Sequence, residues 1–253
     1  MANYLITGSS RGLGLALASG LAASPASQIG TVFATARQDN SPQLRELIDK
    51  SAGRVGFVQL DVNNTQSIQE AVKSVEGQLQ GKGLDVLINN AGIMPITPGG
   101  LEAMYVYFWM LFLIIINMLR RLQNRDKLNE TFDMNVTSVH NVTRAFLPLL
   151  RKSQKKTVVN MYVFQLCFTS SVPKLMRNSS TTLGSIGLAG NFAAMPAPEY
   201  KITKAALNML TVQYAQACAK EGFTIFSISP GVRSVSHAIL WTFTFTPRIE
   251  GRV

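Results

Sequence analysis

A tyrosine and a lysine stand four residues apart in the stretch "YKITK", residues 200–204. Residues with this spacing on a helix share one face, so the Lys204 ammonium can lie beside the Tyr200 phenol. A free phenol has a pKa of about 10, and a nearby positive charge favours the phenolate and lowers that pKa. Such a phenol can donate a proton to a carbonyl oxygen, or accept it in reverse. A solvated helix face would show the same pair, so this chemistry needs support from elsewhere in the chain.

A glycine-rich turn near the start of the chain gives that support. The stretch "TGSSRGLG", residues 7–14, places Gly8, Gly12 and Gly14 between an apolar strand and an apolar helix. Glycines allow a tight turn and a close approach of the backbone to a pyrophosphate, which the positive N-terminus of the helix attracts. The turn alone also fits an ordinary strand–helix connection. The strand before it and the helix after it favour dinucleotide binding.

The rest of the chain must supply the elements that hold these residues. Short apolar strands are predicted at 3–8, 31–36, 54–62, 84–92, 155–161 and 224–231. Helices are predicted from the glycine turn through Leu21 and at 65–79, 127–150 and 200–222. Strands that alternate with helices indicate parallel βαβ units, hence an α/β fold with a Rossmann-type, doubly wound parallel sheet. No internal repeat or low-complexity linker divides the chain, so a single domain is expected.

The motifs occur in an order that resembles the short-chain dehydrogenase/reductase family over residues 1–231. They are "TGSSRGLG" (7–14), "LDV" (60–62), "NNAG" (89–92), Asn135 in "MNVTS", "YKITK" (200–204) and "SPG" (229–231). The likeness is greatest to sniffer-type carbonyl reductases and fungal ketoreductases. It implies reduction of an aldehyde or ketone to an alcohol by hydride transfer, with the tyrosine as general acid. The partner implied is a small-molecule carbonyl substrate.

The same resemblance implies a set of cofactor-binding residues. These are Gly8, Ser10, Arg11, Gly12, Leu13, Gly14, Arg37, Asp61, Val62, Asn90, Ala91, Gly92, Tyr200, Lys204, Pro230 and Gly231. Within this set, the family's pattern gives Asp61 and Val62 the adenine and lets "NNAG" stabilise the sheet beside the cofactor. No metal is implied.

The choice between NAD(H) and NADP(H) has a physical argument of its own. NAD-specific sites place an acid at the end of the second strand, where it accepts hydrogen bonds from the ribose. Here that strand ends with Ala36, and Arg37 follows. With Arg11, two guanidinium groups suit a 2′-phosphate. We therefore predict NADP(H), while the nearby Asp39 keeps NAD(H) open.

The resemblance implies a catalytic set of Asn135, Ser180, Tyr200 and Lys204. In the family the asparagine holds a water relay to the lysine, and a serine hydrogen-bonds the carbonyl. Ser180 is the preferred serine and Ser185 the alternative. Ser170 and Ser171 imitate the motif but lie about thirty residues before the tyrosine.

The stretch "AMYVYFWMLFLIIINMLRR", residues 103–121, has no place in the family's pattern. Its apolar run ends at Asn117, short of the roughly 20 residues that a membrane-spanning helix needs. Segments 105–125 and 162–177 each follow the methionine of a Met-Tyr-Val tripeptide and end at an arginine. The codons ATG-TAY-GTN contain a sequence like an intron donor, and an AGR arginine codon supplies an acceptor AG. We hypothesise that both segments are translated introns; genuine divergence and a membrane-attached reductase using 103–119 are the alternatives.

Excision of the two segments leaves one Ile or Met at each join and restores the family's pattern. The joined sequences read "GGLEA(I/M)DKLNETFDMNV" and "KKTVVN(I/M)NSSTTLGS". The tail, residues 232–253, lacks the family's threonine-bearing loop, further helix and last strand, so the chain resembles a C-terminally truncated product. We expect a reductase domain over residues 1–231 with an aberrant tail. A catalytically impaired or inactive cofactor-binding product is the alternative function.

The composition narrows the classes of partner. The net charge of +10 falls largely within the two extra segments and the tail, and no basic stripe with interleaved aromatics appears, so no nucleic-acid partner is expected. The cysteines, Cys167 and Cys218, form no disulfide framework, and the N-terminus shows no secretory pattern. A cytoplasmic protein without a membrane partner is expected. The resemblance implies that the parent enzyme is a homo-oligomer.

Overall fold

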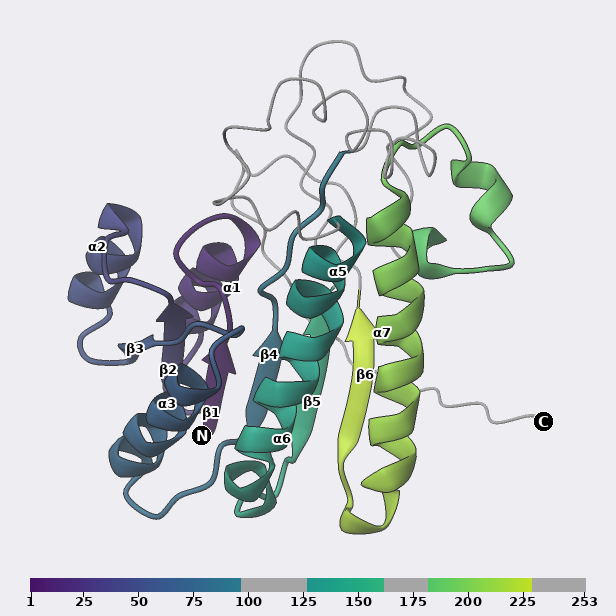
Figure 1. Ribbon diagram of the computed structural model, residues 1–253. Coiled ribbons are helices and arrows are strands. Elements are labelled where there is room, and N and C mark those ends of the chain that lie inside the picture. The colour runs from purple at the N-terminus through teal and green to yellow at the C-terminus, as the bar shows by residue number, and fades with distance from the viewer. Residues whose placement is uncertain (97–126, 162–181, 229–253) are drawn as a thin grey trace.

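The structure, a computed structural model, describes residues 1–96, 127–161 and 182–228. Within these residues six parallel strands form one sheet in the order β3-β2-β1-β4-β5-β6 (Figure 1). The strands are β1 (Ala2–Ile6), β2 (Ile29–Ala36), β3 (Val55–Gln59), β4 (Val86–Asn89), β5 (Thr157–Met161) and β6 (Thr224–Ile228). The order reverses between β1 and β4, the point at which open α/β sheets bind their ligands.

Helices cover both faces of the sheet (Figure 1). They are α1 (Gly12–Ala23), α2 (Pro42–Lys50), α3 (Thr65–Leu79), α5 (Lys127–Phe132), α6 (Ser138–Arg151) and α7 (Pro198–Ala217). A π-helical turn, Asp133–Thr137, joins α5 to α6, and 3-10 turns occur at Thr182–Gly184, Ala189–Phe192 and Ala219–Glu221. Helices α1 and α2 pack on one face, and α3, α6 and α7 on the other. The predicted Rossmann-type sheet and single domain are confirmed.

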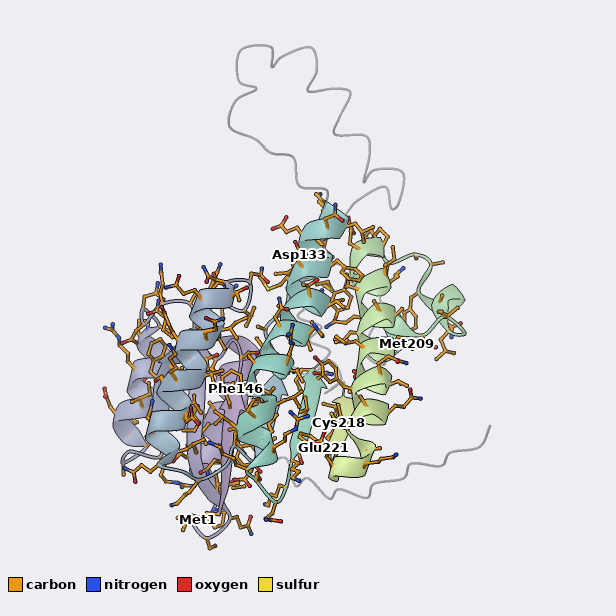
Figure 2. The ribbon with its side chains drawn as sticks, turned by 60° about the horizontal axis from the view of Figure 1, so that its bottom comes forward. Met1, Asp133, Phe146, Met209, Cys218 and Glu221 are labelled. Atoms are coloured by element: carbon orange, nitrogen blue, oxygen red, sulfur yellow. The ribbon has the colours of Figure 1, made fainter. Side chains whose placement is uncertain are left out.

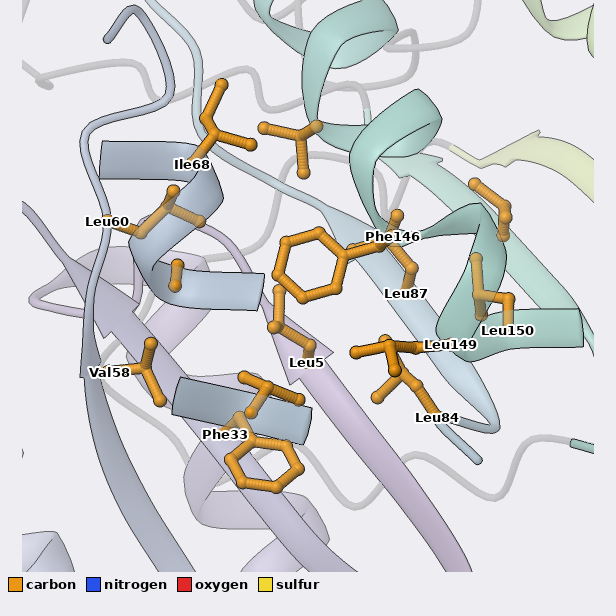
Figure 3. Close-up of a cluster of buried hydrophobic side chains, with 14 of the residues drawn as sticks. Leu5, Phe33, Val58, Leu60, Ile68, Leu84, Leu87, Phe146, Leu149 and Leu150 are labelled. Atoms are coloured by element: carbon orange, nitrogen blue, oxygen red, sulfur yellow. The ribbon is translucent and has the colours of Figure 1, made fainter. Parts of the chain in front are cut away.

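The central strands are apolar on both sides because both faces of the sheet are covered. Successive side chains of a strand point to opposite faces. Leu5 and Phe33 are buried on the side of α3 and α6, in one cluster with Phe146, and Figure 3 shows Leu5 next to the Phe146 ring. Their neighbours Ile6 and Ala34 are buried on the α1 side. Continuous apolar strands in the sequence are therefore what this two-sided core requires.

Helices α6 and α7 run beside one another and carry much of the site. Figure 2 places Asp133 at one end of this pair, and Cys218 and Glu221 at the other. Arg151 of α6 and Glu221 form an ion pair with Nε and Oε2 2.6 Å apart. Tyr214 of α7 also joins its hydroxyl to His140 Nδ1 of α6, at 2.9 Å. The ion pair joins the two helices at the end remote from Asp133, and the Tyr214–His140 contact joins the first turn of α6 to the last part of α7.

Two local features differ from the prediction. The single helix expected over 127–150 is interrupted by the π-helical turn, and helix α2 was not anticipated. Its start does carry a sequence signal, because Ser41 caps Leu44 N at 3.3 Å and Pro42 takes the first helical position.

Several predicted features lie outside the described residues. They are the segments 105–125 and 162–177, the tail 232–253, and the site residues Ser180, Pro230 and Gly231. None of the helices within 1–96, 127–161 and 182–228 is long and apolar enough to cross a membrane.

Candidate active site

The glycine turn between β1 and α1 has a backbone that only glycine adopts readily. Gly8 and Gly12 have φ of +70° and +60°, in the region that disfavours residues with a Cβ. Gly14 is required for space. A Cβ built on Gly14 would lie 2.3 Å from the Gly8 carbonyl oxygen and 2.6 Å from Asn90 Nδ2. The predicted glycines therefore each have a physical role in the turn.

The "NNAG" segment after β4 braces this turn. The Thr7 hydroxyl oxygen accepts hydrogen bonds from the backbone N–H groups of Asn90 and Ala91, both at 2.9 Å. The Asn90 amide nitrogen donates to the carbonyl oxygens of Thr7 and Gly8, at 2.8 and 3.1 Å. The two motifs, more than eighty residues apart, thus meet at the switch point between β1 and β4.

The residues present fit a dinucleotide. Helix α1 begins at Gly12, and the side chain of its N-cap residue, Arg11, makes no capping hydrogen bond within the described part of the chain. Its first N–H groups therefore suit a pyrophosphate. The buried Asn90 Oδ1 also has no hydrogen-bond partner among the described residues. It is a polar atom that a bound ligand or water can satisfy.

Two exposed arginines flank the adjoining edge. Arg11 and Arg37 are both solvent-exposed. Their loops are joined, because the Ser41 hydroxyl donates to the Ser10 carbonyl oxygen at 2.6 Å. Asp39, the acid that kept NAD(H) open, pairs instead with Arg45, whose Nε lies 3.2 Å from Asp39 Oδ1. This arrangement leaves the two cations at the edge and engages the acid elsewhere.

The predicted adenine residues follow β3. Asp61 N donates to the Ser67 hydroxyl at 2.9 Å, and Asp61 Oδ1 accepts from Asn63 N at 3.0 Å. Val62 is buried in the core cluster of α3 and α6. Asp61 and Val62 therefore lie at the carboxyl end of β3, in a turn that leads into α3.

Tyr200 and Lys204 share one face of α7, as predicted. Only 2% of Tyr200 and 4% of Lys204 is exposed. Lys204 Nζ lies 5.3 Å from the centre of the Tyr200 ring and donates to the Met161 carbonyl oxygen at 3.3 Å. Burial lowers the pKa of Lys204 to about 7, because desolvation disfavours the charged form. The lysine is thus poised to change its charge near neutral pH.

The Tyr200 ring belongs to a small apolar cluster separate from the main cores. Its buried members are Leu183, Met195, Ala197 and Tyr200, and Met94 and Phe192 pack against them. Low polarity around the phenol strengthens every charge interaction there.

Asn135 lies in the π-helical turn and is 1% exposed. Its Nδ2 donates to the Ile93 carbonyl oxygen at 2.8 Å, and its Oδ1 accepts from Ile93 N at 2.9 Å. A Cβ on Gly92 would lie 2.9 Å from Asn135 Oδ1, so glycine is needed here as well. Such turns inside helices are frequent at functional sites, and this one turns the asparagine toward the loop after β4.

The alternative serine can be placed, whereas Ser180 lies outside the described residues. Ser185 is half-buried and follows the 3-10 turn Thr182–Gly184. A Cβ on Gly184 would lie 2.9 Å from the carbonyl carbon of Lys204. Asn208 Nδ2 also donates to the Gly184 carbonyl oxygen at 3.2 Å. The turn before Ser185 is therefore docked on α7 next to the lysine.

Sequence reasoning missed two hydroxyl groups that organise the site. Thr7 joins the two cofactor motifs, as described above, and Thr203 stands between Tyr200 and Lys204 with 0% exposure. Both lie inside stretches that were singled out, "TGSSRGLG" and "YKITK". Their signal was a small hydroxyl residue within an otherwise apolar or glycine-rich motif.

Comparison with known proteins places this geometry among relatives. A profile of the short chain dehydrogenase family matches residues 2–165. The short-chain dehydrogenase/reductase AacuF of Aspergillus aculeatus is 34% identical over 235 residues, which cover 92% of this chain and 75% of that protein. The short-chain dehydrogenase/reductase atnB of an Arthrinium species is 30% identical over 233 residues, covering 91% of this chain and 74% of that protein.

Solved structures give the same picture. The NADPH-bound carbonyl reductase from chicken fatty liver has a TM-score of 0.67 and 26% identity, and the match covers 91% of this chain and 76% of that one. The carbonyl reductase Sniffer of D. melanogaster has a TM-score of 0.68 and 24% identity, covering 91% of this chain and 80% of that one. The latter likeness concerns the fold alone.

Proposed function

This chain belongs to the short-chain dehydrogenase/reductase family of oxidoreductases, and from that premise we propose that it reduces an aldehyde or ketone to an alcohol with NADPH. One observation carries the proposal. A buried lysine has its Nζ 5.3 Å from the ring centre of a buried tyrosine, and burial lowers the pKa of that lysine to about 7. Groups with strongly perturbed pKa values that lie beside a ligand-binding edge are candidates for catalysis.

Each side chain has a distinct task in this mechanism. When bound, NADPH supplies the hydride to the carbonyl carbon. The Tyr200 hydroxyl donates its proton to the carbonyl oxygen, on which negative charge develops. The Lys204 ammonium, 5.3 Å from the ring centre, favours the phenolate that remains. Tyr200 is buried in one apolar cluster with Met195 and Ala197, and burial strengthens the attraction between phenolate and ammonium.

The remaining members of the proposed set orient the reacting groups. Asn135 holds the loop after β4 through both of its hydrogen bonds to Ile93. A serine hydroxyl donates to the carbonyl oxygen; Ser180 is proposed for this role, with Ser185 as the alternative. A small carbonyl compound is the proposed substrate, and a cytoplasmic, homo-oligomeric enzyme remains a prediction.

The choice of NADPH over NADH rests on charge. Arg11 and Arg37 are exposed at the edge of the glycine turn, and a guanidinium binds a phosphate by paired, charge-assisted hydrogen bonds. The double variant Ala36→Asp, Arg37→Ala puts an acid where NAD-specific sites have one and removes one cation. We expect it to reverse the cofactor preference in the ratio of kcat/KM values. An unchanged ratio would show that these residues do not select the cofactor.

The test of the proposed function is an assay of two purified proteins. One is the full chain; in the other, residues 104–125 and 161–177 are each replaced by a single methionine. NADPH oxidation is followed with a panel of aldehydes, ketones and quinones, and the alcohol product is identified. Reduction that disappears in the Tyr200→Phe variant supports the proposal. NADPH binding by both proteins without any turnover supports the inactive cofactor-binding alternative.

Activity confined to the shortened protein would support the hypothesis of translated introns. Comparable activity and solubility of the two proteins would contradict that hypothesis and favour genuine divergence. An exposed apolar stretch is an aggregation liability, so we expect the full chain to be the less soluble of the two.

A further inference from the structure

Thr203 is a fully buried hydroxyl residue between the two catalytic side chains of α7. Its hydroxyl donates to the Tyr200 carbonyl oxygen at 2.9 Å and accepts from Asn135 Nδ2 at 3.2 Å. A threonine hydroxyl has one donor, and here it is directed at the backbone of the catalytic tyrosine. The hydroxyl therefore connects Asn135 directly to the residue that carries the phenol.

The amide of Asn135 is fixed in turn by the loop that follows "NNAG". Its Oδ1 accepts from Ile93 N, and one N–H of its Nδ2 donates to Ile93 O. An amide nitrogen has two N–H donors, and the second reaches Thr203 Oγ1. Rotation of the amide by half a turn would set Nδ2 against Ile93 N, so only one orientation satisfies all three contacts.

We propose that Thr203 is a positioning residue for the reduction. It fixes the position of the Tyr200 phenol relative to the loop after β4, which carries Ile93. The inference rests on the proposed function for its kinetic consequence. The loop after β4, the π-helical turn and the first turns of α7 come from three distant parts of the chain. Two buried side chains, Asn135 and Thr203, join them by hydrogen bonds. A misplacement of about 1 Å at a reacting group can cost on the order of a hundredfold in rate, so the loss of this link should affect catalysis before binding.

A second buried threonine on the same helix gives a matched control. Thr211 is 6% exposed, and its hydroxyl contacts Leu207 O at 2.7 Å, Asn160 Nδ2 at 2.9 Å and Ser227 Oγ at 2.8 Å. It lies two helical turns beyond Thr203 and bonds to β5 and β6, not to Asn135. Thr→Val at either position removes one hydroxyl from the same helix while preserving its shape.

The kinetic test compares Thr203→Val, Thr203→Ser and Thr211→Val in the full chain. We expect Thr203→Val to lower kcat by about 10- to 100-fold with the KM for NADPH within about twofold. Thr203→Ser, which keeps the hydroxyl, should recover kcat to within about threefold. Thr211→Val should lower the denaturation midpoint at least as much as Thr203→Val, with kcat within about threefold. A wild-type kcat in Thr203→Val, or an equal loss of kcat in both valine variants, would overturn the inference.

An unfolding cycle tests the link without any turnover. Thr203→Val and Asn135→Ala are made singly and together. The midpoint of denaturant unfolding is measured for each, and midpoints are compared where the dependence of the unfolding free energy on denaturant is unchanged. Both changes break the same hydrogen bond, between Asn135 and Thr203. The double variant should therefore lose less stability than the sum of the losses in the two single variants. Strict additivity would show that the residues are not linked and would overturn the inference. A chain that shows the coupling but reduces no carbonyl would refute the proposed function while leaving the link between the residues supported.

Discussion

The candidate cofactor-binding edge and the candidate catalytic face of this molecule are built by different means. Around β1 and α1 the site consists of backbone: Gly8 and Gly12 turn the chain through positive φ, and Gly14 leaves room for the Gly8 carbonyl. Around α7 the site consists of buried polar side chains, and among them Asn135 donates a hydrogen bond to Thr203. A substitution that adds a Cβ to Gly14 should therefore disrupt the first region. A substitution that removes a hydrogen-bond partner should disrupt the second.

A separate polar network lies deeper in the sheet and joins β4, β5, α6 and the C-terminal half of α7. Asn89 and Asn160 are paired residues on β4 and β5, and Asn89 Nδ2 donates to Asn160 Oδ1 at 2.9 Å and to Thr143 at 3.0 Å. Asn160 then donates to Thr211 of α7. Buried polar networks of this kind are strong only when every member has a partner. This network therefore ties the C-terminal half of α7 to the sheet, two helical turns beyond Thr203, where we expect it to contribute to stability.

The largest effect is expected on the catalytic face, in Tyr200→Phe. A general acid contributes about 10²- to 10⁴-fold to a rate, so kcat should fall by at least about a hundredfold. NADPH affinity should stay within about twofold, because the variant keeps the aromatic ring and leaves unchanged the glycine turn that is predicted to receive the pyrophosphate. The check is steady-state kinetics beside direct NADPH titration. Retention of a tenth of the wild-type turnover would rule out the general-acid role.

Lys204→Met should separate activity from stability on the same face. Turnover should fall by about a hundredfold or more, but the folded state should gain about 1–4 kcal/mol at pH 7. The pKa of Lys204 is lowered by burial to about 7, against about 10.4 in an unfolded chain. Between these pH values the unfolded chain binds more protons, so the stability of the parent rises with pH across this window. The cost of the buried lysine is fully present below pH 7 and disappears above about pH 10.4.

The measurement is thermal unfolding of parent and variant at several pH values. The variant should unfold at the higher temperature at pH 7, and the difference should shrink toward pH 10. A variant that is less stable than the parent at pH 7 would show that contacts of the lysine outweigh its desolvation.

Gly14→Ala tests the backbone side of the comparison. Its Cβ would lie 2.3 Å from the Gly8 carbonyl oxygen, so the turn must shift, and NADPH affinity should fall by at least about tenfold. Overpacking of this kind also costs about 1–3 kcal/mol of stability. Gly20→Ala in the same helix is the control, since its Cβ would meet nothing within 4 Å and should leave NADPH affinity unchanged. Equal NADPH affinities in the two variants would contradict the close approach.

The smallest effect is expected from Arg45→Ala at the outer edge. Arg45 Nε holds Asp39 Oδ1 at 3.2 Å, and both side chains are largely exposed. Removal of the arginine frees an acid near the predicted 2′-phosphate position, so the preference for NADPH over NADH should fall by about two- to fivefold. The ratio of kcat/KM values at low and high salt checks this. A preference that rises instead would mean that Asp39 does not face the cofactor.

The sequence predicted the backbone-built region better than the side-chain-built one, for a physical reason. The residue type alone indicates the role of Gly8, Gly12 and Gly14, since only glycine suits such a turn. The residue type of Thr203 indicates no such role, because buried threonines are common on helices and the hydrogen-bond partner is not visible in the sequence. That partner, Asn135, lies 68 residues away, and contacts at this separation follow from topology.

The periodic pattern of apolar residues also does not predict local departures from regular helix geometry. Residues 127–150 have helical spacing throughout, yet the π-helical turn at Asp133–Thr137 reorients Asn135 within them. The sequence leaves Asp39 as a possible NAD determinant, because its partner Arg45 lies in α2, a helix that the sequence pattern does not predict. The roles of Ser180, Pro230 and Gly231 stay predictions, because these residues lie outside the described part of the chain.

The central claim is that this chain transfers hydride from NADPH to a carbonyl while Tyr200 supplies the proton. The most direct measurement uses NADPH carrying two deuterium atoms at the nicotinamide C4, with the parent chain and Tyr200→Phe assayed side by side. We predict an alcohol that carries deuterium on its carbinol carbon from the parent, and about a hundredfold less or none from the variant. Alcohol without deuterium, or equal labelled product from both proteins, would contradict the claim.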